Sequence, residues 1–335
     1  MLVLAARDVE RALSMPEAIE AASAAYAALS SGRARVPARM AVQSAATLEA
    51  APGTLLVMPG YLEGPESLGA KLITVYPGNP SRGLPLLSAL LLLFDPGSGR
   101  PLAAVEAARL TALRTGAGSG VATKLLALPG AATAAVIGAG VQGRTQLEAV
   151  CAVRPIRRAR VFDLDPARAA AFCAEMSERL DRIGHRLRVE PAASAREAVE
   201  EAEVVVTATT SRDPVLQAGW LQPGAHINAI GSYTPDMSEV GLDVLRRAGK
   251  VVVDCREAVL KEAGEFTGPI QRGEWDAGRI HAEVGEVVLG LKPGRERPDE
   301  ITLYKAVGHA VLDLAVGALA FRRARELGLG VEVDL

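Results

Sequence analysis

Aromatic residues and cysteines are scarce in this chain. Only 4% of its 335 residues are aromatic, and the three cysteines are Cys151, Cys173 and Cys255. The cysteines lie far apart, form no C-x-x-C pair and suggest no disulfide framework, so a reducing compartment is expected. With few aromatic rings, alanine, leucine and valine must fill the core, which suits helices packed on a parallel sheet.

Neither sign of charge is in clear excess. The formal net charge is −2 at pH 7, so there is no global electrostatic attraction to nucleic acid or to an anionic membrane. A short basic cluster lacks interleaved aromatic residues, and we expect it to be a solvated connection between a helix and a strand. Its members are Arg154, Arg157, Arg158 and Arg160.

The sequence also lacks a hydrophobic run of membrane length. The longest run, from Leu84 to Phe94, is interrupted by Pro85, whereas a membrane helix needs about 20 apolar residues. We expect this run to be a buried strand. The first residues become charged within a few positions, so no signal peptide is expected. Together these features predict a cytoplasmic protein that binds neither nucleic acid nor membranes.

Hydrophobic patterning predicts an N-terminal helix followed by strands. Ser14 and Glu17 fit a capping box, and apolar residues follow at helical spacing, which predicts a helix over residues 15–30. From Ala38 to Val105, short apolar stretches are divided by proline and glycine, as in strands linked by turns.

A helix is expected over residues 109–126, and from Ala131 onward strands and helices alternate. Such alternation predicts a parallel sheet with crossover helices. Residues 304–327 are expected to form one long helix, because apolar residues recur there on one face. At roughly 100–200 residues per domain, the length suggests two domains.

A dinucleotide fingerprint lies at the first strand-to-helix junction of this alternation. Gly138, Gly140 and Gly143 form G-x-G-x-x-G after an apolar strand, and Asp163 stands at the end of the next strand. The first glycine permits a tight turn, the second leaves room for the pyrophosphate, and the third allows the helix to pack closely on the strand. The helix N-terminus attracts the phosphates. A Rossmann domain is therefore predicted.

Asp163 favours NAD(H), because its carboxylate would bind the ribose hydroxyls and repel the 2′-phosphate of NADP(H). Arg160 and Arg168 are close in sequence, so NADP(H) remains possible. A second glycine string, GAGSG at residues 116–120, follows no β-branched strand and has no acidic residue at the right distance. We do not expect it to bind a dinucleotide.

Hydride transfer to or from an amino-acid carbon needs one group to hold the carboxylate and another to move a proton. Lys71 interrupts an apolar strand and is either an edge residue facing solvent or a buried amine with a lowered pKa. Arg114 interrupts an apolar helical stretch and is either part of an ion pair or a carboxylate ligand, and Arg39 is a further candidate. The four histidines have no metal-ligand spacing, so no metal is proposed.

Nine segments together resemble the ornithine cyclodeaminase/mu-crystallin family over nearly the whole chain. The segments are VPARM (36–40), LLVMPGY (55–61), GAKLITVYPGN (69–79), RTGAGSG (114–120), VIGAGVQG (136–143), VFDLDP (161–166), VTATTSRDPVL (206–216), NAIGSYTPDMSEV (228–240) and EITLYKAVGHAVLDLA (300–315). As a set they are far more specific than the glycine fingerprint alone.

The resemblance implies roles for individual residues. Lys71 would be the catalytic lysine, and Arg39 and Arg114 would bind the substrate carboxylate beside it. Val307 would border the nicotinamide and the substrate. The implied cofactor-binding residues are Gly138, Gly140, Val141, Gln142, Gly143, Asp163, Thr209, Gly231, Ser232 and Ala306.

The resemblance also implies a homodimer and a domain organisation. A substrate-binding and dimerisation domain would comprise residues 1–115 and 308–335, and an NAD-binding Rossmann domain residues 116–307. The predicted fold class is therefore α/β: a Rossmann domain plus an α+β domain made from the N-terminal part and the C-terminal helix.

The chain departs from the cyclodeaminase pattern near Gly231. Tyr233 stands where ornithine cyclodeaminases have an aspartate that handles the substrate amines, Asp236 is out of register, and Met237 and Ala306 replace a lysine and a serine. These departures favour the branch of ketimine reductases, acting on substrates such as Δ1-pyrroline-2-carboxylate, or an alanine-dehydrogenase-like enzyme of amino-acid metabolism. The alternatives are an NAD-dependent ornithine cyclodeaminase and a non-catalytic binding protein similar to mu-crystallin.

Overall fold

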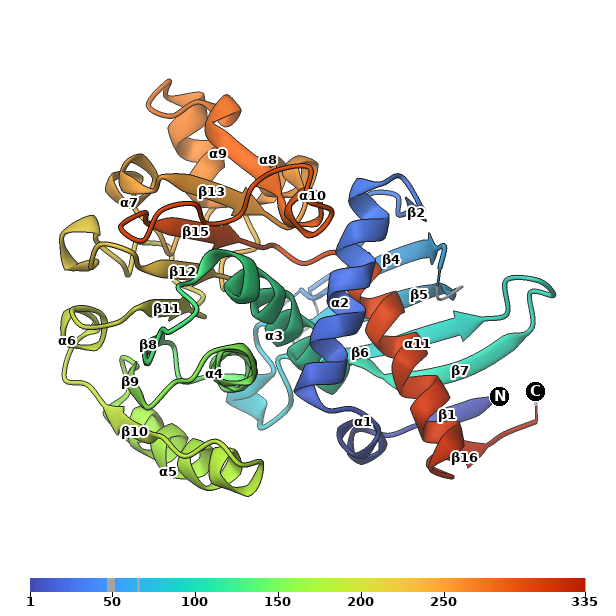
Figure 1. The fold of residues 1–335 in the computed structure, drawn as a ribbon. Coiled ribbons are helices and arrows are strands. Elements are labelled where there is room, and N and C mark those ends of the chain that lie inside the picture. The colour runs from blue at the N-terminus through green and yellow to red at the C-terminus, as the bar shows by residue number, and fades with distance from the viewer. Residues whose placement is uncertain (47–51, 65–66, 335) are drawn as a thin grey trace. The chain divides into compact units, whose positions relative to one another are not determined.

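The computed structural model describes residues 1–46, 52–64 and 67–334. The chain folds into two compact units, both drawn in Figure 1. The first unit comprises Met1–Arg114 and His309–Leu335, and the second comprises Thr115–Gly308. Both ends of the chain therefore belong to the first unit, and the second unit is inserted between them in sequence.

A mostly antiparallel sheet forms the centre of the first unit. Its strands are β1 (Leu2–Leu4), β2 (Ala34–Arg35), β3 (Met40–Gln43), β4 (Thr54–Leu62), β5 (Ser67–Val75), β6 (Leu87–Phe94), β7 (Pro101–Glu106) and β16 (Val331–Glu332). The order is β16-β1-β7-β6-β5-β4-β2, with β3 paired to β4. The expected strands linked by turns are present, apart from residues 47–51 and 65–66, which lie outside the described residues.

Helices of the first unit pack on this sheet. They are α1 (Ala6–Ala12), α2 (Met15–Ser30) and α11 (Ala310–Glu326). The single turn η1 (Pro80–Arg82) lies in the connection between β5 and β6, and α3 (Ala107–Leu126) continues into the second unit. The predicted capping box between Ser14 and Glu17 is confirmed at the start of α2. Helix α11 packs on α2 and on β4, β5 and β6 (Figure 1). Its Gly317 permits this approach, because a Cβ there would lie 2.1 Å from Leu91 Cδ2.

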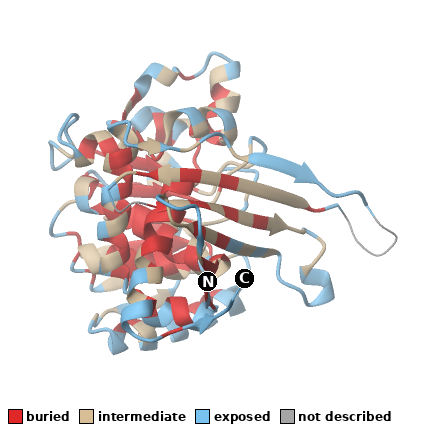
Figure 2. Ribbon diagram, turned by 90° about the vertical axis from the view of Figure 1, so that its right-hand side faces the viewer, coloured by how far each residue is buried: buried red, intermediate tan, exposed pale blue. Residues whose placement is uncertain are grey.

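The strands of this sheet alternate between two faces, as strand geometry requires. On β5, Lys71 and Ile73 are buried, whereas Leu72 and Thr74 are only half-buried. Figure 2 accordingly colours the strands in alternation. The expectation of a buried strand from Leu84 to Phe94 is therefore only half right, since Leu90 is 38% exposed. That run contains a strand with one covered face.

The second unit contains an eight-stranded sheet, parallel throughout. Its strands are β8 (Thr133–Ile137), β9 (Arg158–Phe162), β10 (Arg188–Pro191), β11 (Val204–Thr207), β12 (His226–Ala229), β13 (Lys250–Val253), β14 (Ile280–Glu283) and β15 (Thr302–Lys305). The order is β10-β9-β8-β11-β12-β15-β13-β14. The chain moves outward from β8 in both directions, so a topological switch point lies between β8 and β11, where doubly wound sheets bind ligands.

Helices cover both faces of this sheet. They are α4 (Val141–Val153), α5 (Pro166–Arg182), α6 (Ala195–Val199), α7 (Leu242–Arg247), α8 (Arg256–Glu262), α9 (Gly264–Gln271) and α10 (Val284–Val288), with the turns η2 (Ala218–Trp220) and η3 (Ala277–Arg279). Alternate strand residues enter two separate cores. On β8, Val136 joins the core beneath α4 and α5, whereas Ile137 joins the core beneath α6, α7 and α8. The Rossmann prediction is confirmed.

The expected helix over residues 304–327 is wrong at its start. Tyr304 and Lys305 end β15, which lies between β12 and β13 in the parallel sheet, and α11 begins only after His309. Gly308 has a φ of +89° and separates the strand from the helix. A buried central strand reads as a short apolar run, which periodicity does not distinguish from a helix.

The basic cluster is also less uniform than expected. Arg154 is buried, and its Nη2 donates to the carbonyls of Thr123, Lys124 and Ala127. A guanidinium with several donors suits the unpaired carbonyls at the end of α3. Arg154 is therefore a structural cap on α3 rather than part of a solvated connection.

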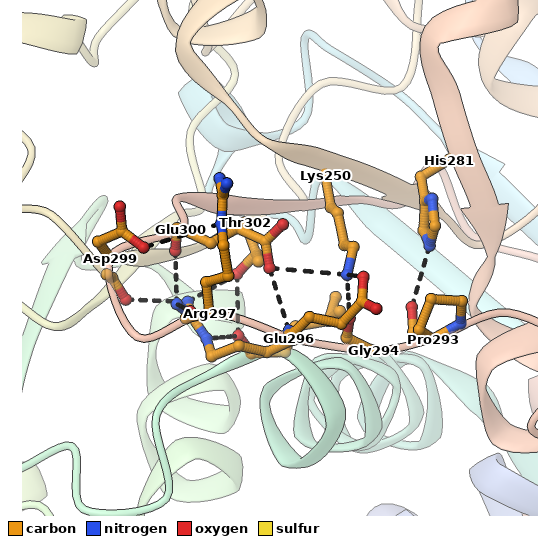
Figure 3. A network of polar contacts seen from close by, with 12 residues as sticks. Lys250, His281, Pro293, Gly294, Glu296, Arg297, Asp299, Glu300 and Thr302 are labelled. Carbon is orange, nitrogen blue, oxygen red and sulfur yellow. Dashed lines mark hydrogen bonds and ion pairs between the residues drawn. The ribbon is translucent and has the colours of Figure 1, made fainter.

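Residues 293–302 hold β13 and β14, at one side of the parallel sheet, near their amino ends. Lys250 at the start of β13 lies 2.6 Å from Glu296 Oε2 and 3.6 Å from Glu300 Oε2 (Figure 3). On the neighbouring strand β14, the Nε2 atom of His281 lies 2.9 Å from the Pro293 carbonyl oxygen (Figure 3). The candidate cofactor residues instead follow the carboxyl ends of β8, β9, β11, β12 and β15.

Candidate active site

Three charged side chains from three elements meet inside the first unit. Lys71 on β5 places Nζ 2.8 Å from Asp313 Oδ2 on α11, and Arg114 on α3 places Nε 2.9 Å from Asp313 Oδ1. All three side chains are buried. Nζ of Lys71 also lies 3.5 Å from Thr111 Oγ1. The solvent-facing alternative for Lys71 is therefore wrong, and Arg114 is in a buried ion pair.

The sheet explains why Lys71 is buried. In the strand register it lies between Met58 on β4 and Leu91 on β6, both of which are buried on the same face. Burial lowers the pKa of Lys71 to about 8, because desolvation outweighs the opposing effect of Asp313, and Arg114 and Arg39 lower it further. An amine with this pKa can both donate and accept a proton near neutral pH.

Arg39 and His309 share the electrostatic environment of this cluster. Both are half-buried. The pKa of His309 is lowered to about 4, mainly by burial; Asp313 opposes this, and Arg39 and Arg114 add to it. With Lys71, Arg39 and Arg114 against one aspartate, the cluster has an excess of positive charge suited to a carboxylate ligand.

The glycine loop of the second unit has the geometry that a bound dinucleotide requires. Gly138 has a φ of +104°, so it makes the tight turn. A Cβ on Gly143 would lie 2.3 Å from the Gly138 carbonyl oxygen, so only glycine allows this packing. A Cβ on Gly140 would meet no atom within 4 Å among the described residues. Nothing in the fold requires glycine at that position, but a pyrophosphate approaching the loop would.

The start of α4 is open to an anion. Gly140 is its N-cap and has no side chain to cap the helix, and Val141 and Gln142 are its first residues. The first amide groups of a helix lack partners within the helix and attract phosphate. Val141 is 61% exposed despite its apolar side chain. The amide groups of Val141 and Gln142 are thus available at the helix start.

Asp163 follows the carboxyl end of β9 and is half-buried. Its Oδ2 accepts a hydrogen bond from the Ala139 amide at 2.8 Å, and its Oδ1 accepts one from the Asp165 amide at 3.0 Å. These bonds hold the carboxylate beside the glycine loop and leave further lone pairs for ribose hydroxyls. Arg160 instead contacts the Glu197 carbonyl and Glu201, while Arg168 is exposed.

A buried glutamate links two loops at the carboxyl edge of this sheet. Oε1 of Glu239 accepts from the amide and hydroxyl of Thr209 at 2.6 and 2.8 Å, and Oε2 accepts from the Gly231 amide and the Thr207 hydroxyl at 2.6 and 3.0 Å. A Cβ on Gly231 would lie 2.1 Å from the Thr209 carbonyl. Thr209 and Gly231, both implied cofactor residues, are therefore fixed against each other.

The hydroxyl of Ser232 is engaged within the protein. It is fully buried, donates to Glu265 Oε1 and accepts from Lys305 Nζ. Lys305 also donates to the Ser232 carbonyl at 2.8 Å, and Glu265 accepts from the Glu239 amide at 2.9 Å. With these bonds, the Ser232 side chain serves to anchor its loop.

Asp254 fixes the segment after β15. Its Oδ2 accepts from the amides of Val307 and Gly308 at 3.1 and 2.8 Å. Ala306 and Val307 are buried at this point. Burial is the main cause of the raised pKa of both Asp254 and Glu239. The Ala306 amide donates to the Ala229 carbonyl at 3.2 Å. Backbone hydrogen bonds therefore hold both implied nicotinamide residues, whatever their side chains.

Residue-level reasoning missed the charged partners of the site. Asp313, Glu239, Glu265, Lys305 and Asp254 are all buried. A signal was available for Glu239, Lys305 and Asp313, since 228–240 and 300–315 are among the resembling segments and carry charged residues within apolar stretches. Tyr233 is half-buried, and burial followed by Asp236 raises its pKa. Across the residues that the structure describes, no cluster of three or more His, Cys, Asp or Glu suggests a metal site.

These features define a dinucleotide-binding enzyme fold with a cationic cluster in its other unit. The model of the ornithine cyclodeaminase/mu-crystallin family matches residues 1–327, and the chain belongs to this family.

Similar proteins span the full chain. The Δ1-pyrroline-2-carboxylate reductase of Bacillus cereus is 38% identical, with all of both chains covered. The structure of the Thermococcus litoralis Δ1-pyrroline-2-carboxylate reductase in complex with NADH and L-proline is 44% identical, with a TM-score of 0.92 over 99% of this chain and 100% of the other. An archaeal alanine dehydrogenase dimer with bound NAD is 33% identical, with a TM-score of 0.89 over 100% of this chain and 99% of the other.

Proposed function

We propose that this protein is an NAD(H)-dependent reductase of Δ1-pyrroline-2-carboxylate, with L-proline as product. The observation that carries the proposal is the buried Lys71–Asp313–Arg114 cluster, since it provides a proton donor of suitable pKa beside a carboxylate ligand. Relatives with this activity span the whole chain, and one of them was solved with NADH and L-proline.

In this reaction the imine carbon gains a hydride and the imine nitrogen gains a proton. NADH supplies the hydride when it is bound. Arg39 and Arg114 bind the substrate carboxylate and fix the orientation of the ring. Lys71, as an ammonium group, donates the proton to the nitrogen as the C=N bond becomes a C–N single bond. Lys71 then regains a proton from solvent before the next turnover.

Asp313 acts on two of these groups at once. It contacts Lys71 through one carboxylate oxygen and Arg114 through the other. Its charge favours the protonated form of Lys71 against the effect of burial. Asp313 thus keeps the proton donor charged and aims the guanidinium of Arg114.

Residues of the second unit serve the cofactor. The amides at the start of α4 bind the pyrophosphate next to Gly140, and Asp163 binds the adenosine ribose. Glu239 fixes Thr209 and Gly231, and Asp254 fixes Val307. The carboxylate of Asp163 favours NAD(H), and NADP(H) is a weaker alternative.

An alanine-dehydrogenase-like reaction is the second candidate, because it uses the same groups on an open-chain imine and a similar dehydrogenase was solved with NAD. A cyclodeaminase reaction is disfavoured by Tyr233. Its phenol, with a raised pKa, is neutral near pH 7 and offers no carboxylate to a second substrate amine. A purely binding role would not require the buried proton donor Lys71.

We also propose a homodimer located in the cytoplasm, without nucleic-acid or membrane partners. Exposed apolar side chains on the sheet of the first unit support a partner copy, since Met40 and Val42 on β3 are 57% and 59% exposed. No helix in the described residues is long and apolar enough to span a bilayer. Light scattering with size exclusion should give the mass of two chains.

NADH oxidation by the purified protein tests the proposed activity. Δ1-Pyrroline-2-carboxylate and its six-membered homologue should be reduced rapidly, and pyruvate with ammonia slowly. L-Ornithine with NAD⁺ should yield no proline. Preference for pyruvate with ammonia would support the dehydrogenase alternative, and proline from ornithine would contradict the role given to Tyr233.

A further inference from the structure

His309 occupies the start of α11 with one ring nitrogen engaged. Its Nδ1 accepts a hydrogen bond from the Val311 amide at 3.4 Å, so it serves as the N-cap of the helix. A ring nitrogen that accepts an amide N–H carries no proton, so the proton of the neutral ring is on Nε2. Within the described residues, Nε2 has no partner, although the ring is more than half-buried.

The charged groups that act on this ring are those of the candidate substrate site. They are Asp313, one helical turn further along α11, together with Arg39 and Arg114. Burial and the two arginines outweigh the aspartate, and the pKa of His309 falls to about 4. The ring is therefore neutral at pH 7, with an N–H donor within electrostatic range of two guanidinium groups.

We propose that His309 donates its Nε2–H to the carboxylate of the imino acid and is a third carboxylate ligand beside Arg39 and Arg114. The proposal rests on the function proposed above. The charge of the site favours a neutral donor here. Lys71, Arg39 and Arg114 against Asp313 leave two positive charges, and the imine becomes cationic as it is protonated. A third cationic ligand would oppose that protonation, whereas a neutral imidazole adds a hydrogen bond without charge.

The capping role and the proposed ligand role can be separated by substitution. An N-cap needs only an acceptor, which serine provides as well as histidine does, whereas alanine provides none. His309→Ser keeps the cap and removes the ring donor. His309→Ala removes both. A role confined to capping would therefore affect His309→Ala alone.

The experiment measures three quantities for wild type and both variants: the KM for Δ1-pyrroline-2-carboxylate, the KM for NADH and the melting temperature. Calorimetric binding of pyrrole-2-carboxylate, an unreactive planar carboxylate, provides a readout independent of turnover. Loss of one hydrogen bond to a charged group is worth about tenfold or more in affinity. We expect both variants to lose about tenfold in KM for the imino acid and in pyrrole-2-carboxylate affinity, with the KM for NADH unchanged and a lower melting temperature only for His309→Ala.

Wild-type affinity in His309→Ser would overturn the inference and leave His309 as a helix cap, with the proposed function intact. A wild-type protein that neither reduces the imino acid nor binds pyrrole-2-carboxylate would overturn the proposed function, and this inference with it. The two failures are thus distinguished by the wild-type measurements.

Discussion

The ammonium group of Lys71 lies 2.8 Å from the carboxylate of Asp313, and both side chains are 1% exposed. A strand lysine and a helix aspartate thus form a buried ion pair in the core of the first unit. Such a pair is a weak source of stability, because desolvation of both charges offsets their attraction. Its position and its effect on the pKa of Lys71 fit the catalytic role proposed above.

Substitution of Lys71 by methionine should abolish reduction while the protein remains folded. Methionine fills a similar volume and removes the proton donor, and general acid catalysis is worth about 10²–10⁴-fold in rate. We expect a fall of that size in kcat, with little change in the KM for NADH. Lys261→Met, at an exposed position of α8, is the matched control and should keep full activity. Retention of more than a tenth of wild-type kcat by Lys71→Met would argue against the assignment.

The two directions of the reaction should have opposite pH dependence. Reduction requires protonated Lys71, so its rate should be constant below the pKa of about 8 and fall as pH rises through it. Oxidation of L-proline requires neutral Lys71, so its rate should rise over the same interval. Initial rates at saturating cofactor from pH 6 to 10 measure both profiles. Parallel profiles in the two directions would contradict Lys71 as the group that exchanges the proton.

Asp313→Asn should shift the reduction profile to lower pH. Removal of its charge removes the favourable interaction that opposes burial, so the pKa of Lys71 should fall further below 8. Loss of one partner of a buried pair also destabilises the fold, by about 3–5 kcal/mol. A pH profile and a denaturant titration of the variant measure the two effects. If the reduction rate of the variant falls over the same alkaline pH range as that of the wild type, Asp313 does not set the pKa of Lys71.

Gly140→Ala should impair cofactor binding without harming the fold. A methyl group there would meet no described atom within 4 Å, and Gly140 has a φ of −83° that alanine adopts readily. The methyl group would, however, occupy the approach of the pyrophosphate. We expect the KM for NADH to rise about tenfold or more, with an unchanged melting temperature.

Gly130→Ala is the matched control for this substitution. Its Cβ would also meet nothing within 4 Å among the described residues, and Gly130 lies outside the fingerprint. It should leave the KM for NADH unchanged. Equal NADH affinity in both variants would remove the support for a pyrophosphate site at the glycine loop.

Glu239→Gln tests the link between the two cofactor loops. One carboxylate accepts four hydrogen bonds from Thr207, Thr209 and Gly231, and an amide has one acceptor oxygen to replace two. We expect a higher KM for NADH and a smaller change in kcat, measured per folded protein. A lower melting temperature with unchanged kinetic constants would instead indicate a purely structural role for Glu239.

The sequence predicted those features of the site that depend on neighbouring residues. It did not predict the contacts between residues that lie far apart in the chain. The glycine loop and Asp163 could be predicted because a tight turn, a helix start and a strand end are set by neighbouring residues. The burial of Lys71 depends on β4, β6 and α11 together, so its sequence neighbours left two alternatives open. Asp313 reaches Lys71 and Arg114 only because α11 returns to the first unit after the second unit is complete.

The error at Tyr304 and Lys305 has a similar cause. These residues follow an apolar pattern that fits a helix, but β15 is inserted between β12 and β13 and is buried on both faces. Alternation of polar and apolar residues is absent from such a strand. The glycine at position 308 was a local sign in the sequence that the helix begins later. Its positive φ in the structure separates the strand from the helix.

The most direct test of the central claim follows a deuteride from cofactor to product. The purified protein is supplied with NADH carrying deuterium at the transferable C4 position and with Δ1-pyrroline-2-carboxylate, and the product is analysed by mass spectrometry and chiral chromatography. The proposed reductase activity predicts L-proline with one deuterium at the α carbon, formed in a one-to-one ratio to the NADH oxidised. The Lys71→Met variant should form almost no labelled proline. Absence of NADH oxidation, or proline without the label, would contradict the proposed reaction.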